Sequence, residues 1–471
     1  MFEPVIAPSG TLLGLLQRGR GDGTLHALAA PRAEAVEALD HCVLSDPRHD
    51  WQVENRSLYY ARLYLDLDGG LEAIEAHLFQ ADDHLDTDET RTGLALAVLG
   101  HLASYGRDDA LHLLRRYAVS GSNWAWALDE LALRDDDSGL HSLALPVLAR
   151  FPATAEGEAE LAAAVRDAFE PRPWRLWAED TREAVGSRVR AARERGSFDR
   201  WQRQLRPTGP RPGWSVQAVF DYAEEGLERG VELFLPASRC LGAVAGSDDR
   251  DVIIEAARSG PDGARCTALH YLAESRDPVV LDLVEVAAAD PSRTVADAAL
   301  HAFERMCGDA AVDRARRWVQ RPDALGGTAA GVLACRGGAQ DAGLVLGALR
   351  ETVRAQGPDA RLLWTLVDGA GRLGIDAAAP VLRHVYRETA SSHLRGQTAR
   401  ALAATDPSFA TGFAVECLWD CEETTREIAA LHAETGDARV AERLRRLAAD
   451  PAEEAEVQTA VRSRIGDTPP L

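Results

Sequence analysis

An arginine-rich segment with interleaved tryptophan contains the residue types best suited to bind a charged partner. Between residues 172 and 211 lie 11 arginines and 5 acidic residues, a local charge of +6 in a chain whose net charge is −22. Guanidinium groups can bind phosphates or carboxylates, and an indole ring can stack on a base. The alternative is a helix whose positive charge pairs with the acidic remainder of the chain. The candidate partner-binding residues are Arg188, Arg190, Arg193, Arg195, Arg200, Trp201 and Arg203.

A second group of arginines recurs at nearly constant spacing in the C-terminal half. Six short stretches align, with equivalent positions 265, 296, 328, 361, 395 and 426, and four of these are arginine. A row of guanidinium groups could grip acidic side chains or phosphates. The regular spacing favours the other interpretation, a structural ladder in which each arginine bonds its own and the neighbouring repeat. The predicted ladder consists of Arg265, Arg361, Arg395 and Arg426.

Two further motifs could carry chemistry but have simpler explanations. Trp124, Trp126 and Asp129 fall within six residues, yet the spacing of Trp124 and Leu128 is that of a buried helix face. Cys417 and Cys421 lie one helical turn apart, but no second ligand pair follows at zinc-binding spacing. We therefore expect buried side chains at both places, and we expect no catalytic residue, no metal ligand and no cofactor.

Composition limits the function classes. The chain has 471 residues, of which 46% are hydrophobic, so it can bury a sizeable core. Its 74 acidic residues exceed its 52 basic ones, all of which are arginine. Such a polyanion is repelled by nucleic acids and by anionic membranes, so neither is expected as a partner. Seven cysteines, no leader segment and no run of 18 apolar residues predict a cytoplasmic protein with free thiols.

The elements that position these residues are predicted to be paired helices. Acidic residues that could open helices recur every 30–35 residues in the C-terminal half, a period typical of stacked helix pairs. Apolar residues within the repeats follow helical spacing, as in Val295, Ala299, Ala302 and Phe303. Strand patterns are almost absent. The recurring residues are Asp277, Asp309, Asp341, Asp376, Asp406 and Asp437.

This pattern resembles HEAT repeats, especially the short bacterial kind related to phycobilisome-lyase repeats. The best-matching unit begins at Asp277-Pro278, contains Asp290-Pro291 and Val295, and ends before Gly308. Ala296 replaces the arginine usual in the family. The resemblance covers residues 236–465 well and the N-terminal part loosely. It implies an all-α, HEAT-like α-solenoid of stacked antiparallel helix pairs.

Composition also predicts three parts. Divergent repeats occupy residues 1–165, and the better-matching repeats occupy residues 236–471. Between them, residues 166–235 form a connecting module rich in arginine, tryptophan and proline, with prolines clustered near both ends of its basic stretch. Because proline cannot continue a helix, these clusters predict boundaries.

The resemblance favours a non-enzymatic scaffold or adaptor that binds a protein partner on the concave face of the solenoid. Two alternatives come from related families. The Trp124, Trp126 and Asp129 cluster resembles that of HEAT-like alkylpurine DNA glycosylases, in which aromatic faces and an aspartate stabilise a cationic base. The other alternative is a lyase-like accessory or assembly factor.

Overall fold

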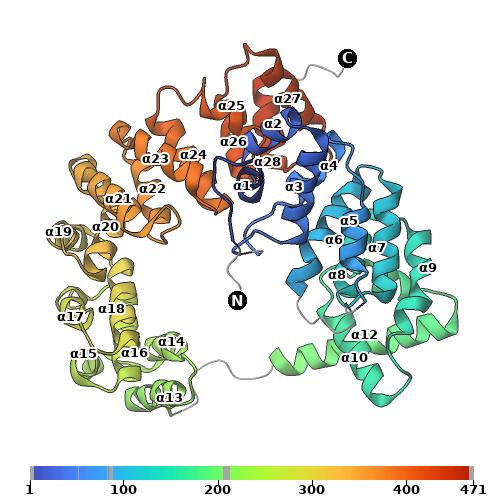
Figure 1. Cartoon of the computed structure of the whole chain (residues 1–471). Helices are drawn as coiled ribbons and strands as arrows, with labels where there is room; N and C mark the ends of the chain where they lie inside the picture. Colours follow the sequence, from blue (N-terminus) through green and yellow to red (C-terminus); the bar gives the residue numbers. More distant parts are fainter. Residues whose placement is uncertain (1–4, 51, 82, 84–88, 205–212, 466–471) are drawn as a thin grey trace. The chain divides into compact units, whose positions relative to one another are not determined.

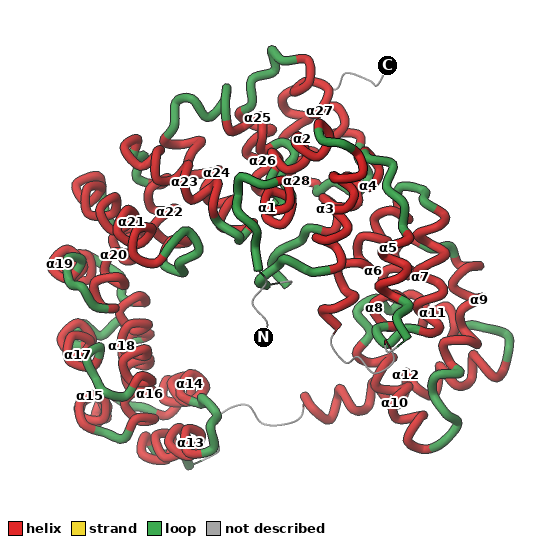
Figure 2. The backbone as a smooth tube through the Cα atoms, in the orientation of Figure 1, coloured by secondary structure: helices red, strands yellow, loops and turns green. Residues whose placement is uncertain are grey.

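The chain folds into helices throughout the part that can be described. The computed structural model describes residues 5–50, 52–81, 83, 89–204 and 213–465, excluding the side chains of residues 89–90, 197–204 and 465. Within these ranges it contains 28 α-helices, short 3-10 turns and no strand (Figures 1 and 2). The all-α class predicted from the repeats is confirmed.

The contacts between elements group the chain into two units. Unit 1 consists of residues 1–205 and 385–471, and unit 2 consists of residues 206–384. The helices of unit 1 in its N-terminal segment are α1 (Leu12–Arg18), α2 (Gly21–Ala29), α3 (Arg32–Leu44), α4 (Ser57–Asp66), α5 (Glu72–Leu78), α6 (Glu89–Ser104), α7 (Asp108–Ser120), α8 (Trp124–Arg134), α9 (Asp137–Leu148), α10 (Ala155–Asp167), α11 (Arg172–Ala178) and α12 (Glu183–Gln204). Those of its C-terminal segment are α24 (Ser392–Thr405), α25 (Phe413–Cys417), α26 (Glu423–His432), α27 (Ala438–Ala449) and α28 (Ala455–Ile465).

Unit 2 is a succession of helix pairs. In each of four pairs the first helix packs on the second, and the second helices α16, α18, α20 and α22 pack on one another in order. The pairs form because each helix buries one apolar face, as α18 does with Val295, Ala299 and Phe303. Its helices are α13 (Val216–Glu228), α14 (Phe234–Val244), α15 (Arg250–Ser259), α16 (Asp262–Glu274), α17 (Val280–Ala287), α18 (Arg293–Arg305), α19 (Asp309–Trp318), α20 (Ala324–Arg336), α21 (Ala342–Gln356) and α22 (Leu363–Arg372), while α23 (Ala379–Glu388) crosses the boundary.

The recurring aspartates lie at or ahead of the first helix in successive pairs, from Asp277 before α17 to Asp437 before α27. Asp437 caps α27, because its side chain accepts a hydrogen bond from the backbone N–H of Arg439. The periodic residue marks helix starts by position, but its capping role varies, since Asp309 is the first residue of α19 and the N-cap there is Gly308.

Unit 1 joins the two ends of the chain. Helix α2 packs on α25, and Arg62 of α4 forms ion pairs with Asp450 and Glu453, which precede α28. In this grouping by contacts, residues 385–471 fall with the N-terminal helices, and the boundary at 205/206 lies within residues 166–235. The three parts read from composition stay a prediction. Ion pairs such as that of Arg62 with Asp450 link the two segments of unit 1.

None of the helices in the described ranges is both long enough and apolar enough to span a bilayer.

Candidate functional site

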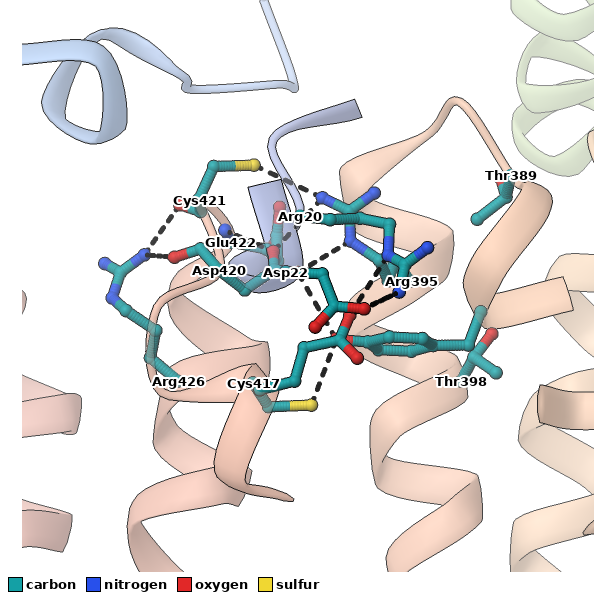
Figure 3. Close-up of polar contacts among 12 residues, drawn as sticks. Arg20, Asp22, Thr389, Arg395, Thr398, Cys417, Asp420, Cys421, Glu422 and Arg426 are labelled. Carbon is teal, nitrogen blue, oxygen red and sulfur yellow. Dashed lines mark hydrogen bonds and ion pairs between the residues drawn. The ribbon is translucent and has the colours of Figure 1, made fainter. Parts of the chain in front are cut away.

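The predicted arginine ladder contains buried ion pairs at two of its four positions. The Arg395 guanidinium on α24 donates to both carboxylate oxygens of Asp420, at 2.8 and 3.1 Å, and both side chains are fully buried. Asp420 also accepts the backbone N–H of Glu422 ahead of α26. Figure 3 shows this pair between two successive repeats. The arginine therefore ties one helix pair to the next. Its Nη1 makes no hydrogen bond among the described residues, but the side chain is fully buried and out of reach of a partner.

Arg426 on α26 repeats the arrangement one step later. It donates to Glu453 at 2.7 and 3.0 Å and to the carbonyl oxygens of Asp420 and Cys421. Burial would raise the pKa of Glu453, but Arg426 and Arg62 lower it to about 2. The pair is charged at neutral pH and ties α26 to α28.

The other two ladder positions are closer to solvent. Arg265 on α16 pairs with Asp290 at 2.7 Å at a partly exposed site. Arg361 lies exposed in the turn before α22, so its unit departs from the ladder geometry of Arg395. The helix of that unit begins only at Leu363, two residues after the aligned position.

The N-terminal helices extend the ion-pair network of the ladder. Arg20 donates to Glu416 at 2.6 Å, and Cys421 donates its backbone N–H to the carbonyl oxygen of Gly19. Burial raises the pKa of Glu416 to about 7, against the lowering effect of Arg20. This network holds the two chain segments of unit 1 together.

The two cysteines singled out in the sequence belong to that network. Cys417 is fully buried and lies 3.1 Å from the Tyr386 hydroxyl, while Cys421 accepts a contact from Arg395 at 3.3 Å. Burial raises the pKa of the Cys421 thiol to about 12. Across the described ranges, no group of three His, Cys, Asp or Glu side chains could hold a metal ion.

The candidate partner-binding arginines on α12 divide into two kinds. Arg188 donates to Glu158 at 2.6 Å and to the carbonyl oxygens of Leu148 and Phe151, and Arg190 donates to the carbonyl oxygen of Ala178. These two arginines join α12 to its own unit. Arg193 and Arg195 are exposed. The side chains of Arg200, Trp201 and Arg203 lie outside the described residues.

A pocket of about 530 Å³ lies between α8, the end of α10 and the start of α11. We call it the tryptophan pocket. Helix α8 contributes residues spaced three and four apart, such as Trp126, Asp129 and Glu130, whose side chains are neighbours on one face of the helix. The loop after α10 contributes Phe169, which is 84% exposed. The lining residues are Asn123, Trp124, Ala125, Trp126, Leu128, Asp129, Glu130, Leu133, Ala164, Asp167, Ala168, Phe169, Glu170 and Trp174.

Aromatic contacts fix the walls of the tryptophan pocket. The Trp124 ring meets Phe151 and Trp174 edge to face, at centroid distances of 5.6 and 6.4 Å, and Trp174 meets Trp177 in the same way. The Arg150 guanidinium lies 5.5 Å from the centre of the Trp124 ring. Trp174 and Trp177 are almost fully buried, so these walls are anchored in the core.

Carboxylates give the tryptophan pocket its charge. Asp129 accepts the backbone N–H of Glu170 at 3.0 Å, while burial raises the pKa of Asp129 to about 6. Burial raises the pKa of Glu130 to about 7, although Arg134 and a hydrogen bond with Trp126 favour its ionised form. Asp167 is paired with Arg166, and the lining contains no arginine. At pH 8 both Asp129 and Glu130 are ionised, and the pocket is an aromatic cavity with negative charge.

The sequence draws attention to Trp124, Trp126 and Asp129 but predicts buried side chains there. The structure instead leaves all three half-buried and lining one cavity, because the residues opposite them do not close it. The helical spacing of Trp126 and Glu130 was a signal for the latter. No local signal places Glu170 and Trp174 opposite Asp129, because they follow it by more than forty residues.

Searches against protein-family models and against curated proteins find no match to this chain.

Proposed function

We propose that this protein is a non-enzymatic scaffold that binds a cationic group of a protein partner in the tryptophan pocket. The observation that carries the proposal is a cavity of about 530 Å³ whose lining includes three tryptophans and four acidic residues, with no basic residue among them. The volume falls within the range of roughly 300–1,000 Å³ that small-molecule pockets occupy. It exceeds what one methylated ammonium group needs, so part of the adjoining chain could also enter.

The chemistry of the lining supports a cation over a neutral group. The face of an indole ring attracts a cation, by about 2 kcal/mol when the site is desolvated. Asp129 adds a negative charge at pH 8, above its pKa of about 6, and the Glu170 side chain lines the same cavity. A quaternary ammonium or a methylated lysine satisfies both features at once. The exposed Phe169 in the loop after α10 offers an apolar contact to the chain that carries the cation.

We also propose that the helix pairs constitute a HEAT-like α-solenoid. The ordered packing of α16, α18, α20 and α22 supports it, as do the starts of α17, α19 and α21 at recurring aspartates. Solenoids bind extended partners along their surface, and a pocket at one place would anchor such a partner. The partner is then held by one buried cation and by a longer, weaker contact.

Choline tests this function as the smallest probe. We expect calorimetric titration at pH 8 to show one site, and Asp129→Asn to weaken binding at least about tenfold, because it removes the charge that faces the cation. The matched control is Glu160→Gln, an exposed acid on α10, which should bind like the wild type. Equal affinity of Asp129→Asn and the wild type would contradict the proposal.

The protein partner requires a second experiment. A partner recovered by immobilised wild-type protein but lost with Asp129→Asn would use the tryptophan pocket, whereas one retained by the variant would bind elsewhere. Glu160→Gln again serves as the control for the charge change.

One observation favours a second function, a nucleic-acid enzyme of the HEAT-like glycosylase type. Trp124, Trp126 and Trp174 share the cavity with Asp129, and such a set could stack on an extruded base and stabilise its positive charge. Four acidic residues at the same cavity would repel the phosphates that carry the base. Binding to plain duplex DNA with a steep salt dependence would favour this second function over the scaffold.

A further inference from the structure

A smaller pocket beside the tryptophan pocket is lined by three arginines. It has a volume of about 140 Å³ and lies where α10, α11 and α12 meet. Trp174 contributes to both pockets and so forms a common wall between them. We call the smaller one the arginine pocket. Its lining residues are Val165, Arg166, Pro171, Trp174, Arg175, Arg193 and Gly196.

Two of the three arginines have no carboxylate partner. Arg175 and Arg193 are exposed, and across the described ranges neither makes a side-chain hydrogen bond or an ion pair. Arg166 pairs with Asp167 at 2.5 Å, and that carboxylate lines the tryptophan pocket instead. On the same helix as Arg193, Arg188 is held by Glu158 and by carbonyl oxygens. Two unpaired guanidinium groups therefore line the same pocket, in a chain that carries an excess of 22 negative charges.

Close packing of two helices brings these charges together. A Cβ atom on Gly196 of α12 would lie 3.0 Å from the Cβ of Arg166 on α10, so only glycine permits this approach without a shift. The approach places Arg193, one helical turn earlier on α12, at the same cavity as Arg166. Arg175 reaches the cavity from α11. Arg166 is compensated by Asp167, but gathering the unpaired Arg175 and Arg193 at one cavity costs free energy unless an anion lies between them.

We propose that the arginine pocket binds a phosphate monoester carried by the same ligand whose cation occupies the tryptophan pocket. Guanidinium groups match phosphate oxygens in geometry and charge. The common wall formed by Trp174 puts the anionic and cationic sites side by side, as a zwitterionic ligand requires. The proposed anion site depends only on its own arginines. The claim that one ligand fills both pockets rests on the proposed function.

Three probes separate these claims: choline for the cation site, inorganic phosphate for the anion site, and phosphocholine for both. We expect phosphocholine to bind at least about tenfold more tightly than choline, because linking two groups makes the second contact intramolecular. In the double variant Arg175→Gln/Arg193→Gln, phosphocholine should bind only as well as choline. Choline itself should bind this variant and the wild type equally. Arg361→Gln, an exposed arginine of unit 2, is the matched control.

The outcomes distinguish failure of this proposal from failure of the proposed function. If phosphocholine binds no more tightly than choline in the wild type, or if the double variant retains the full advantage, the proposal is overturned. If choline does not bind but phosphate binds in an arginine-dependent way, the proposed function fails and the anion site stands. A peptide with phosphoserine next to trimethyllysine separates the two sources of such a ligand. Binding as tight as that of phosphocholine supports a modified protein, and absence of peptide binding supports a small molecule.

Discussion

Two regions of unit 1 use charge in opposite ways. Where α24–α28 meet the N-terminal helices, Arg395, Arg426 and Arg20 are buried and each faces a carboxylate within 3.1 Å. Around α8–α12, Asp129 has only a backbone N–H as its hydrogen-bond partner, and Arg193 is exposed with no partner across the described ranges. In the first region each of these arginines is paired with a carboxylate of the protein. In the second, Asp129 lines the tryptophan pocket and Arg193 lines the arginine pocket, and neither is in an ion pair across the described ranges.

The comparison shows that a regular row of arginines does not by itself make a binding surface. Taking a charge out of water is costly, so a buried arginine is retained only with a partner of good geometry. Once it is paired and buried, as Arg395 is, it cannot reach a ligand even where one donor such as Nη1 stays unbonded, so its role is to position helices. The places that can bind a ligand are those where the chain has not supplied the opposite charge.

The largest expected effect is on stability in the paired region. Arg395→Ala leaves the Asp420 carboxylate buried without its partner, and we expect a loss of about 3–5 kcal/mol in the free energy of unfolding. Denaturant unfolding measures it. The aligned but exposed Arg361→Ala should change the same quantity by less than about 0.5 kcal/mol. If both variants lost the same free energy of unfolding, the distinction between buried, paired arginines and exposed ones would be wrong.

The paired region should also control acid stability. The folded pKa of Glu453, about 2, lies below the ordinary value of 4.5, so its ion pair stabilises the fold above pH 4.5 and this contribution is lost as the pH falls towards 2. We expect Glu453→Gln to flatten this part of the stability curve. The measurement is the free energy of unfolding as a function of pH. If Glu453→Gln lost as much stability as the wild type between pH 4.5 and 2, the proposed role of the Glu453 ion pair would be contradicted.

Two arginines of one helix sharpen the comparison on a smaller scale. Arg188 bonds Glu158 and two carbonyl oxygens, so Arg188→Ala should lower the free energy of unfolding by about 1–3 kcal/mol. Arg193→Ala should change it by less than about 0.5 kcal/mol, since this exposed side chain makes no hydrogen bond or ion pair across the described ranges. Thermal melts of both variants check this pair of values. A melting point lowered equally by both would show that Arg193 also supports the fold.

The smallest effect concerns the pH dependence of binding in the open region. Asp129, with a pKa of about 6, and Glu130, with a pKa of about 7, gain charge as the pH rises from 5 to 8. Glu170 and Asp167 face the same cavity. Choline affinity should therefore rise several-fold over this range, and Asp129→Asn should reduce the rise. An affinity that falls with pH would contradict this electrostatic account.

The sequence predicted local features better than distant ones. Helix starts at recurring aspartates follow from capping, which acts over three residues. The ladder spacing located Arg395 and Arg426 but not the ion pair of Arg62 with Glu453, the carboxylate that Arg426 also binds, because no local period reports a contact 391 residues apart. Arg361 departs from the ladder because its helix starts later. Likewise Trp124, Trp126 and Asp129 were visible as neighbours, whereas Trp174 joins them only when α11 folds back over α8.

The most direct test compares choline with 3,3-dimethylbutan-1-ol, an uncharged molecule of the same shape, in calorimetric titrations of the wild-type protein at pH 8. If unpaired negative charge and aromatic faces make the tryptophan pocket a cation site, choline should bind at least about tenfold more tightly, since cation–π attraction in a desolvated site is worth about 2 kcal/mol. Equal affinities would show an apolar cavity indifferent to charge, and binding of neither molecule would show that the open region has no such site.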